Sequence, residues 1–203
     1  MVEAQEALEQ VLIEGVPLKN AYNFSSLGFV AQADGSREHA VVVRMAQARS
    51  SFGKLRHIWK SKSLSLKAKL QVYQSGVCSV LVYGHEAWKL TSKVVKMLRG
   101  WNARCLAQIS GRDVPEECRN PSFDLISTLR VRRLRWVGHV IRMDVNRLDR
   151  RVLVSKTQPY DEGDVLADCP THSDMSELIS MACDRDTWRL EAVGALKARL
   201  GVK

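Results

Sequence analysis

Apolar residues follow two different patterns, one before and one after Ser36. In residues 10–30 they form short groups that are interrupted by Gly15, Pro17 and Gly28. Such punctuation is typical of short strands joined by turns. After Ser36, apolar residues recur every three or four positions, which indicates amphipathic helices. The sequence therefore predicts a mainly α fold with a small N-terminal β element.

Three helices are predicted between Ser36 and Gly111. The first follows a turn at Ser36 and runs through Trp59, Ser65 can cap the second, and Ser92 can cap the third, which ends at Gly111. Their apolar positions predict a shared core. The second helix contributes Leu66, Leu70, Tyr73, Val77, Val80 and Leu81, and the third contributes Val94, Leu98, Trp101, Cys105 and Ile109.

A fourth helical region is predicted from about Phe123 to Met143, and it has an apolar face and a basic stripe. The stripe consists of Arg132, Arg135, His139 and Arg142, which follow one another at three- and four-residue spacings. Two further arginines, Arg130 and Arg133, fall within the apolar sector. Either their side chains reach out to solvent, or the helix begins later than this pattern suggests.

The C-terminal third contains a change in composition that predicts a boundary between helical modules. Residues 155–172 hold two prolines and an Asp-Glu-Gly-Asp run, which indicates a linker or long loop. Two short helices then follow, at Asp174–Ala182 and Asp186–Leu200. We therefore divide the chain into a β-containing segment (1–35), a helical domain (36–154), a linker (155–172) and C-terminal helices (173–203).

Charge is distributed unevenly along the chain, whose net charge is +9. Residues 1–36 carry −4, residues 37–151 carry +16, with 24 lysines and arginines against 8 acids, and residues 152–203 carry −3. A basic middle between two acidic ends favours a polyanionic partner such as nucleic acid. The alternative is a set of helix faces whose lysines and arginines contact only water.

The cysteines and apolar runs point to an intracellular chain, in the nucleus or the cytoplasm. Five cysteines without close pairing argue against a secreted disulfide framework. No apolar run exceeds four residues, too few to cross a bilayer, and the acidic N-terminus is unlike a signal peptide. The residues Cys169, His172 and Cys183 have a spacing that could chelate a metal. They lack the paired second half of a zinc motif, so we predict reduced thiols and no metal.

Catalytic motifs are missing from the sequence. It contains no glycine-rich phosphate loop, no G-x-S-x-G and no H-E-x-x-H. The sequence thus predicts no active site.

Several motifs carry a resemblance to a known family. Residues 81–88 read L-V-Y-G-H-E-A-W, residues 104–111 read R-C-L-A-Q-I-S-G, residues 132–143 read R-R-L-R-W-V-G-H-V-I-R-M, and residues 184–189 read D-R-D-T-W-R. In this order they resemble motifs that follow the polymerase core of non-LTR (LINE-like) retrotransposon reverse transcriptases. Residues 24–28, F-S-S-L-G, resemble the F-x-Y-L-G at the edge of that family's palm, with Ser26 in place of tyrosine.

The resemblance implies a truncated C-terminal part of such an RNA-directed DNA polymerase: the palm edge, a thumb-like helical bundle and C-terminal helices. The family's catalytic aspartates lie upstream of F-x-Y-L-G, and this chain contains no Tyr-x-Asp-Asp. We therefore expect no enzymatic activity from the chain itself and no cofactor, because Mg²⁺ would belong only to the missing catalytic part. The implied partners are RNA and the RNA–DNA duplex of template and primer.

A thumb holds its duplex through backbone contacts, which need lysine and arginine on helix faces. The predicted contact residues are Lys54, Arg56, Lys60, Lys62, Lys67, Lys69, Arg132, Arg135 and Arg142. The other motif residues are expected to be structural: Tyr83, Gly84, Glu86, Trp88, Trp101, Cys105, Trp136, Gly138, His139 and Trp188. For the tryptophans we expect core packing rather than base stacking, and for His139 packing or capping.

Two other functions stay open on the sequence alone. The chain could be a helical module derived from such an element that acts through protein partners, or a remnant without a selected function. Salt-dependent binding to an RNA–DNA duplex separates the reverse-transcriptase interpretation from both alternatives.

Overall fold

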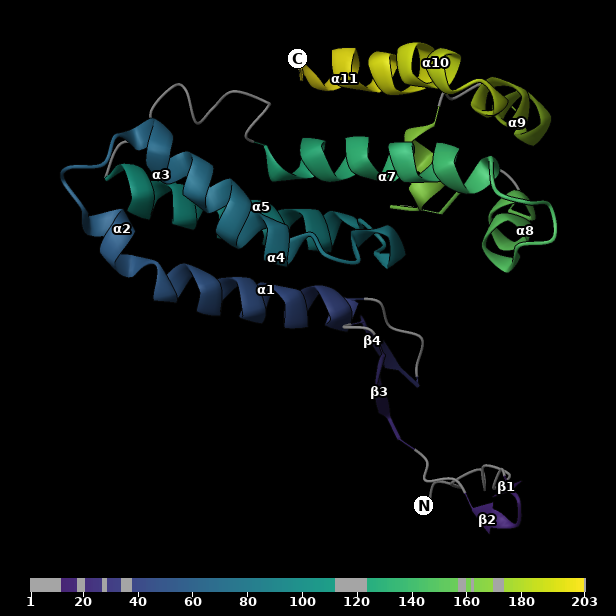
Figure 1. The fold of residues 1–203 in the computed structure, drawn as a ribbon, viewed down its shortest axis with the longest axis horizontal. Helices are drawn as coiled ribbons and strands as arrows, with labels where there is room; N and C mark the ends of the chain where they lie inside the picture. Colours follow the sequence, from purple (N-terminus) through teal and green to yellow (C-terminus); the bar gives the residue numbers. More distant parts are fainter. Residues whose placement is uncertain are drawn as a thin grey trace, which may run out of the picture.

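The computed structural model describes residues 12–17, 21–26, 29–33, 38–111, 124–156, 160–161, 163–169 and 174–202. The protein is mainly helical with a small N-terminal β part, which confirms the predicted fold class. Strands β1 (Leu12–Ile13) and β2 (Val16–Pro17) pair antiparallel, as do β3 (Asn23–Ser26) and β4 (Phe29–Gln32). Both hairpins lie beyond the N-terminal end of α1, and β1–β2 stands well away from the helices (Figure 1).

The first helical region consists of α1 (Glu38–Lys54), α2 (Arg56–Lys60), α3 (Leu66–Tyr73) and α4 (Ser79–Leu81). The predicted cap at Ser65 is confirmed, because its side chain accepts a hydrogen bond from the Ala68 N–H. A π-helical turn, Gln74–Cys78, joins α3 to α4 within what the sequence predicted as one regular helix. The turn at Ser36 lies outside the described residues.

Two long helices follow, α5 (Ser92–Ser110) and α7 (Leu125–Ile141). The cap of α5 was predicted at the wrong residue: Thr91 accepts the hydrogen bond from the Val94 N–H, and Ser92 is the first helical residue. Asp124 caps α7 through the Ser127 N–H, which sets its start within two residues of the prediction. Gly111, at the end of α5, has a positive φ of 91°.

The C-terminal part consists of α8 (Leu148–Val154), a 3-10 helix (Val165–Asp168) and three short helices. These are α9 (Met175–Cys183), α10 (Arg185–Thr187) and α11 (Gly194–Leu200), with a π-helical segment, Trp188–Val193, between α10 and α11. Figure 1 shows α9, α10 and α11 lying along one side of α7, opposite α1 to α5.

Two hydrophobic cores meet on α7. The first lies among α1, α3, α4, α5 and the N-terminal end of α7, up to Leu129. The second begins at Val131 on α7 and includes side chains of α8, the 3-10 helix, α9 and the segment 188–200. The single helix α7 thus contributes side chains to both cores. The helices around the first core and those around the second are therefore joined by packing as well as by the chain.

Residues 155–172 were predicted as a linker or long loop. The described part of that stretch packs on α7: Val165, Leu166 and Cys169 are buried in the second core. The backbone carbonyl of Gly163 accepts hydrogen bonds from the Arg133 side chain and from the Leu90 N–H. Two features hold this stretch in place: apolar residues spaced for a 3-10 turn, and the side chain of Arg133, which lies 30 residues before Gly163. Composition indicates neither of them.

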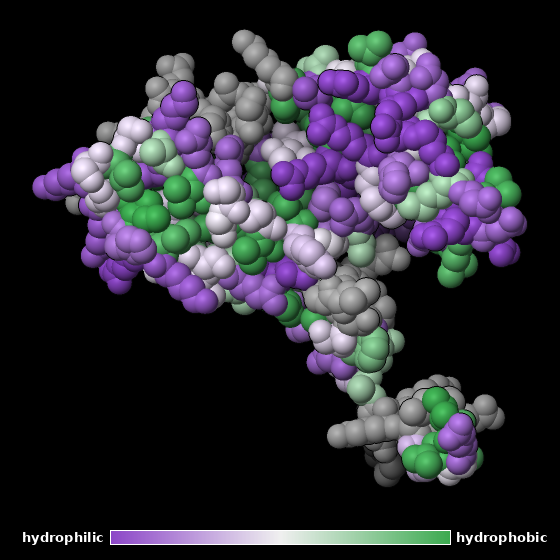
Figure 2. Space-filling model, in the orientation of Figure 1, coloured by the Kyte–Doolittle hydropathy of each residue, from purple (hydrophilic) through white to green (hydrophobic). Residues whose placement is uncertain are grey.

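Figure 2 shows hydrophilic residues gathered over the α9–α11 side of the molecule, with more mixed colouring over the α1–α4 side. Among the helices of the described ranges, none is both long and apolar enough to cross a membrane.

Candidate nucleic-acid interface

Five of the predicted contact residues form an exposed basic surface at one end of the helical body. Lys54 ends α1, Arg56 and Lys60 flank α2, Lys62 lies in the loop before α3, and Lys67 lies in its first turn. We call this group the α2–α3 basic surface. None of its five side chains forms an ion pair within the described parts of the chain.

The charge around this surface is strongly one-sided. Residues 38–111, all of which the structure describes, contain 13 lysines and arginines but only two acids, Glu38 and Glu86. Glu38 pairs with Lys93, and Glu86 lies beside His85, so neither neutralises the α2–α3 basic surface. A positive surface of this kind attracts phosphate backbones without reading their sequence.

Aromatic packing holds α2 rigidly against α1 and α3. The Phe52 and Trp59 rings stack with centroids 5.0 Å apart, and the indole N–H of Trp59 donates to the Phe52 carbonyl at 2.9 Å. Tyr73 is buried beside them and donates its hydroxyl proton to Asn102 at 2.7 Å. Burial, together with the nearby Cys78 and Cys105 thiols, raises the pKa of Tyr73, so the hydroxyl stays protonated and the bond is kept.

Lys69, the sixth predicted contact on these helices, has a different role. It is half-buried, and its Nζ donates to the Trp59 carbonyl at 3.1 Å. This bond ties α3 to the last turn of α2, where backbone carbonyls have no partner within the helix. Lys69 therefore positions the surface and does not belong to its exposed part.

The predicted basic stripe on α7 is only partly present. Arg132 and Arg135 are exposed, but the guanidinium of Arg142 donates to the Ala182 carbonyl at 2.7 Å and joins the end of α7 to α9. Burial and the nearby Arg185 lower the pKa of Arg142. Arg142 thus differs from Arg132 and Arg135: it is half-buried and uses one N–H group on a carbonyl 40 residues away, and phosphate contact by the three arginines stays a prediction.

Of the two arginines in the apolar sector of α7, Arg130 reaches solvent with 37% of its side chain exposed, whereas Arg133 is buried, and the helix does not begin later. Arg133 is 1% exposed, and its Nη2 donates to the Gly163 carbonyl at 2.8 Å. Arg130 lies with its Nε 3.7 Å from the Asp168 carboxylate. Polar partners in residues 163–168 therefore replace the apolar neighbours that the pattern implied.

The L-V-Y-G-H-E-A-W segment forms the turn between α4 and α5. Gly84 has a φ of 72°, which the turn requires and which side chains with a Cβ rarely adopt. His85 is buried, and its Nδ1 lies 2.7 Å from the Val82 carbonyl. Burial lowers the pKa of His85, so the ring is neutral and Nδ1–H is the donor. Trp88, 2% exposed, packs in the first core as predicted.

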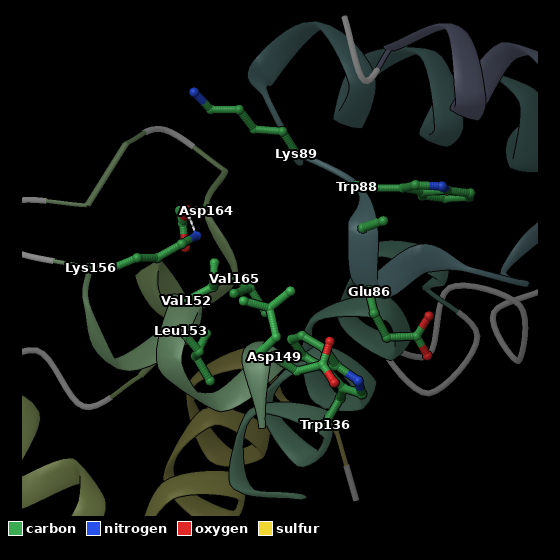
Figure 3. A pocket seen from close by; sticks show the side chains of 12 residues that line it. Glu86, Trp88, Lys89, Trp136, Asp149, Val152, Leu153, Lys156, Asp164 and Val165 are labelled. Atoms are coloured by element: carbon green, nitrogen blue, oxygen red, sulfur yellow. Dashed lines mark hydrogen bonds and ion pairs between the residues drawn. The ribbon is translucent and has the colours of Figure 1, made fainter. Parts of the chain in front are cut away.

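Tyr83 and Trp136 are the aromatic residues of the helical motifs that are not fully buried. Tyr83 is 57% exposed, with the Arg44 guanidinium 4.4 Å from its ring centroid. Trp136 is half-buried and lies between two grooves. One is bordered by Tyr83, His85 and Arg132, and the other is the groove of Figure 3. The expectation of core packing is confirmed for Trp88 and Trp101 but holds only in part for Trp136.

The groove in Figure 3 has a volume of about 450 Å³ and lies between the 85–89 turn and α8. Trp136 and Asp149 lie at one side of it, and the Lys156–Asp164 ion pair lies at the other. The Trp88 ring points away from it into the first core. The described residues that line it include no serine, threonine, cysteine or histidine.

The motifs at 132–143 and 184–189 are structural partners. Trp188 is 2% exposed and lies directly on Gly138, where an added Cβ would come within 2.3 Å of its Nε1. The indole N–H of Trp188 donates to the Leu134 carbonyl at 3.2 Å. Asp184 caps α10 through the Asp186 N–H. His139, next to Gly138, is exposed in the last turn of α7, so it does not pack in a core, and its capping role stays a prediction.

The proposed metal spacing places no ligands together within the described residues. Cys169 is buried in the second core, and burial raises its pKa to about 12. Cys183 is exposed at the end of α9, and His172 lies outside the described residues. No group of three metal-ligating side chains occurs among the residues that the structure describes.

Sequence reasoning missed a cluster of charged residues around Asp168. Arg130, Arg133 and Arg199 all lie near this 91%-buried side chain, and only tertiary contacts bring them together. A signal was present: two arginines in the apolar sector of a helix indicate that a buried acid or carbonyl faces them. The partners of these arginines, Gly163 and Asp168, lie 30 to 38 residues away and could not be named from spacing.

The family model described as Domain of unknown function (DUF6451) matches residues 51–83, from the end of α1 to the turn after α4. This stretch contains all five residues of the α2–α3 basic surface and ends within the L-V-Y-G segment. No curated protein and no solved structure matches the chain.

Proposed function

We propose that the chain is the C-terminal part of a non-LTR retrotransposon reverse transcriptase, and that it binds template–primer nucleic acid through the α2–α3 basic surface. The observation that carries the proposal is this exposed group of five lysines and arginines, which have no ion-pair partner among the described residues and stand on a rigid aromatic core. The function is binding alone, because the chain has no Tyr-x-Asp-Asp to hold catalytic metals.

The packing of the motifs supports the family part of the proposal. The R-R-L-R-W-V-G-H segment contacts the D-R-D-T-W-R segment through Gly138 and Trp188, and borders the L-V-Y-G-H-E-A-W segment through Arg132 and Trp136. Motifs that touch one another constrain each other's sequence. A single helical unit therefore accounts for the occurrence of these motifs together and in this order.

The duplex-binding part is tested by salt dependence. Binding of the full chain to a fluorescent RNA–DNA hybrid is measured by anisotropy at several salt concentrations. A K60Q/K62Q/K67Q variant should bind more weakly, and its log–log salt slope should fall by roughly 0.7–0.9 for each phosphate that the variant no longer neutralises. These three side chains are exposed, so the fold should be unchanged by circular dichroism.

The matched control removes the same charge elsewhere. Arg151, Arg185 and Arg189 are exposed on α8, α10 and the segment after it, away from the α2–α3 basic surface. An R151Q/R185Q/R189Q variant should keep most of the affinity and the slope. Equal losses in both variants would show that only net charge matters. No binding by the unaltered chain would favour the alternative, a helical module that acts through protein partners.

A further inference from the structure

A cavity of about 350 Å³ lies where α5, α7, α11 and the 3-10 helix meet, and three arginines line it. Arg130 and Arg133 come from α7, and Arg199 comes from α11. Asp168 lies among them, with Arg130 Nε and Arg199 Nη2 each 3.7 Å from its Oδ1. These distances are too long for hydrogen bonds, so the guanidinium groups surround the carboxylate without using their donors on it.

The charges in this cavity do not balance. Asp164, the other acid in the lining, already pairs with Lys156. Three arginines therefore face the single carboxylate of Asp168, which leaves two positive charges in excess among the described lining residues. Partly buried charge without a partner is costly, and a dianion in the cavity would remove that cost.

The hydrogen bonding of Arg133 also indicates a ligand, independently of the charge count. Its side chain is 1% exposed, yet its Nε has no hydrogen-bond partner among the described residues, because only Nη2 reaches the Gly163 carbonyl. An orphaned donor on a buried guanidinium is rare and indicates a missing acceptor. The N-terminal end of α5, a 19-residue helix, also borders the cavity through Ser92 and adds positive potential there.

We propose that this cavity binds a phosphate group, held by Arg130, Arg133 and Arg199 at the N-terminal end of α5. A phosphate dianion carries two negative charges and several acceptor oxygens, and arginine forks match its geometry. Arg130 and Arg199 are partly exposed, so the group can enter from solvent. The site is separate from the α2–α3 basic surface and does not depend on the function proposed above.

The phosphate can be a free ion or the 5′-terminal phosphate of a nucleic-acid strand. Isothermal titration of the full chain with inorganic phosphate, at constant ionic strength, tests the site itself. Anisotropy with one single-stranded oligonucleotide, in 5′-phosphorylated and 5′-hydroxyl forms, identifies the source. A preference for the phosphorylated strand assigns the strand end, and saturable inorganic phosphate binding without that preference assigns the free ion.

The informative variants are Arg130→Gln and Arg199→Gln, because both side chains reach solvent and neither is needed to fill a core. Each should weaken phosphate binding about tenfold, the effect of removing one charge-assisted hydrogen bond. Arg151→Gln and Arg189→Gln remove the same charge from exposed positions outside the cavity and should leave the affinity unchanged. The K60Q/K62Q/K67Q variant should also bind phosphate normally, even if duplex binding fails.

Two results would overturn the proposal. One is the absence of saturable phosphate binding by the unaltered chain. The other is an equal affinity in Arg130→Gln, Arg199→Gln and the two control variants, which would show that phosphate acts only on the overall charge.

Discussion

Replacing Gly138 by alanine would place a methyl group where the Trp188 indole lies. The added Cβ would come within 2.3 Å of Nε1, 2.6 Å of Cδ1 and 2.8 Å of Cε2. Carbon atoms in contact normally stay about 3.5–4.0 Å apart. Neither partner can yield easily, because Gly138 belongs to the backbone of α7 and Trp188 is 2% exposed in the second core.

The expected loss of stability follows from what must move. Overpacking alone costs about 1–3 kcal/mol, and shifting the ring also breaks its bond to the Leu134 carbonyl, which adds about 1 kcal/mol. Alanine is a better helix former than glycine by about 1 kcal/mol, which offsets part of this. We therefore expect Gly138→Ala to lower the free energy of unfolding by about 1–3 kcal/mol.

Gly100→Ala is the matched control. Gly100 lies inside α5, is exposed, and has nothing within 4 Å of an added Cβ. There the same substitution should stabilise by up to about 1 kcal/mol. Urea unfolding followed by circular dichroism in the helical band measures both variants. If Gly138→Ala is as stable as Gly100→Ala, Trp188 does not pack on α7 as described, and the reasoning is refuted.

Two further outcomes test individual groups. Burial lowers the pKa of His85, so below about pH 6.5 the unfolded chain takes up a proton that the folded chain does not. The free energy of unfolding should therefore decrease as the pH is lowered, by at most about 1.4 kcal/mol per pH unit. This decrease should be smaller in His85→Gln. An identical pH slope in both proteins would contradict this. The second test labels thiols with DTNB at about pH 8 in a Cys118→Ser variant. Cys183 is exposed and should react rapidly. The other three thiols should react only on unfolding, because burial raises the pKa values of Cys78, Cys105 and Cys169 to about 12, 11 and 12. Rapid labelling of more than one thiol would show that the cores are open.

The sequence alone determined the elements that depend on local periodicity. The helical face of residues 94–109 is buried as its spacing predicted, the face of residues 66–81 is buried except at Leu66 and Val80, which are half-buried, and Ser65 caps its helix. The short strands before Ser36 were also predictable, because proline fixes φ and glycine allows positive φ in turns; Gly15, for example, lies in the β1–β2 turn with a φ of 78°. An exposed basic surface followed equally directly from lysines that lie off the apolar stripe.

Only the tertiary structure decided which charged side chains remain available to a ligand. Lys69 and Arg142 have the same spacing as their exposed neighbours, yet each donates to a backbone carbonyl of another helix. Arg133 is buried because Gly163 lies against α7, and Gly138 is required because Trp188, 50 residues later, packs on it. The physical reason is the range of the interactions. Helical periodicity comes from backbone hydrogen bonds between residues four positions apart, so it can be read from the local sequence. A buried donor instead bonds to an acceptor that tertiary packing places beside it, and that acceptor can lie anywhere in the chain.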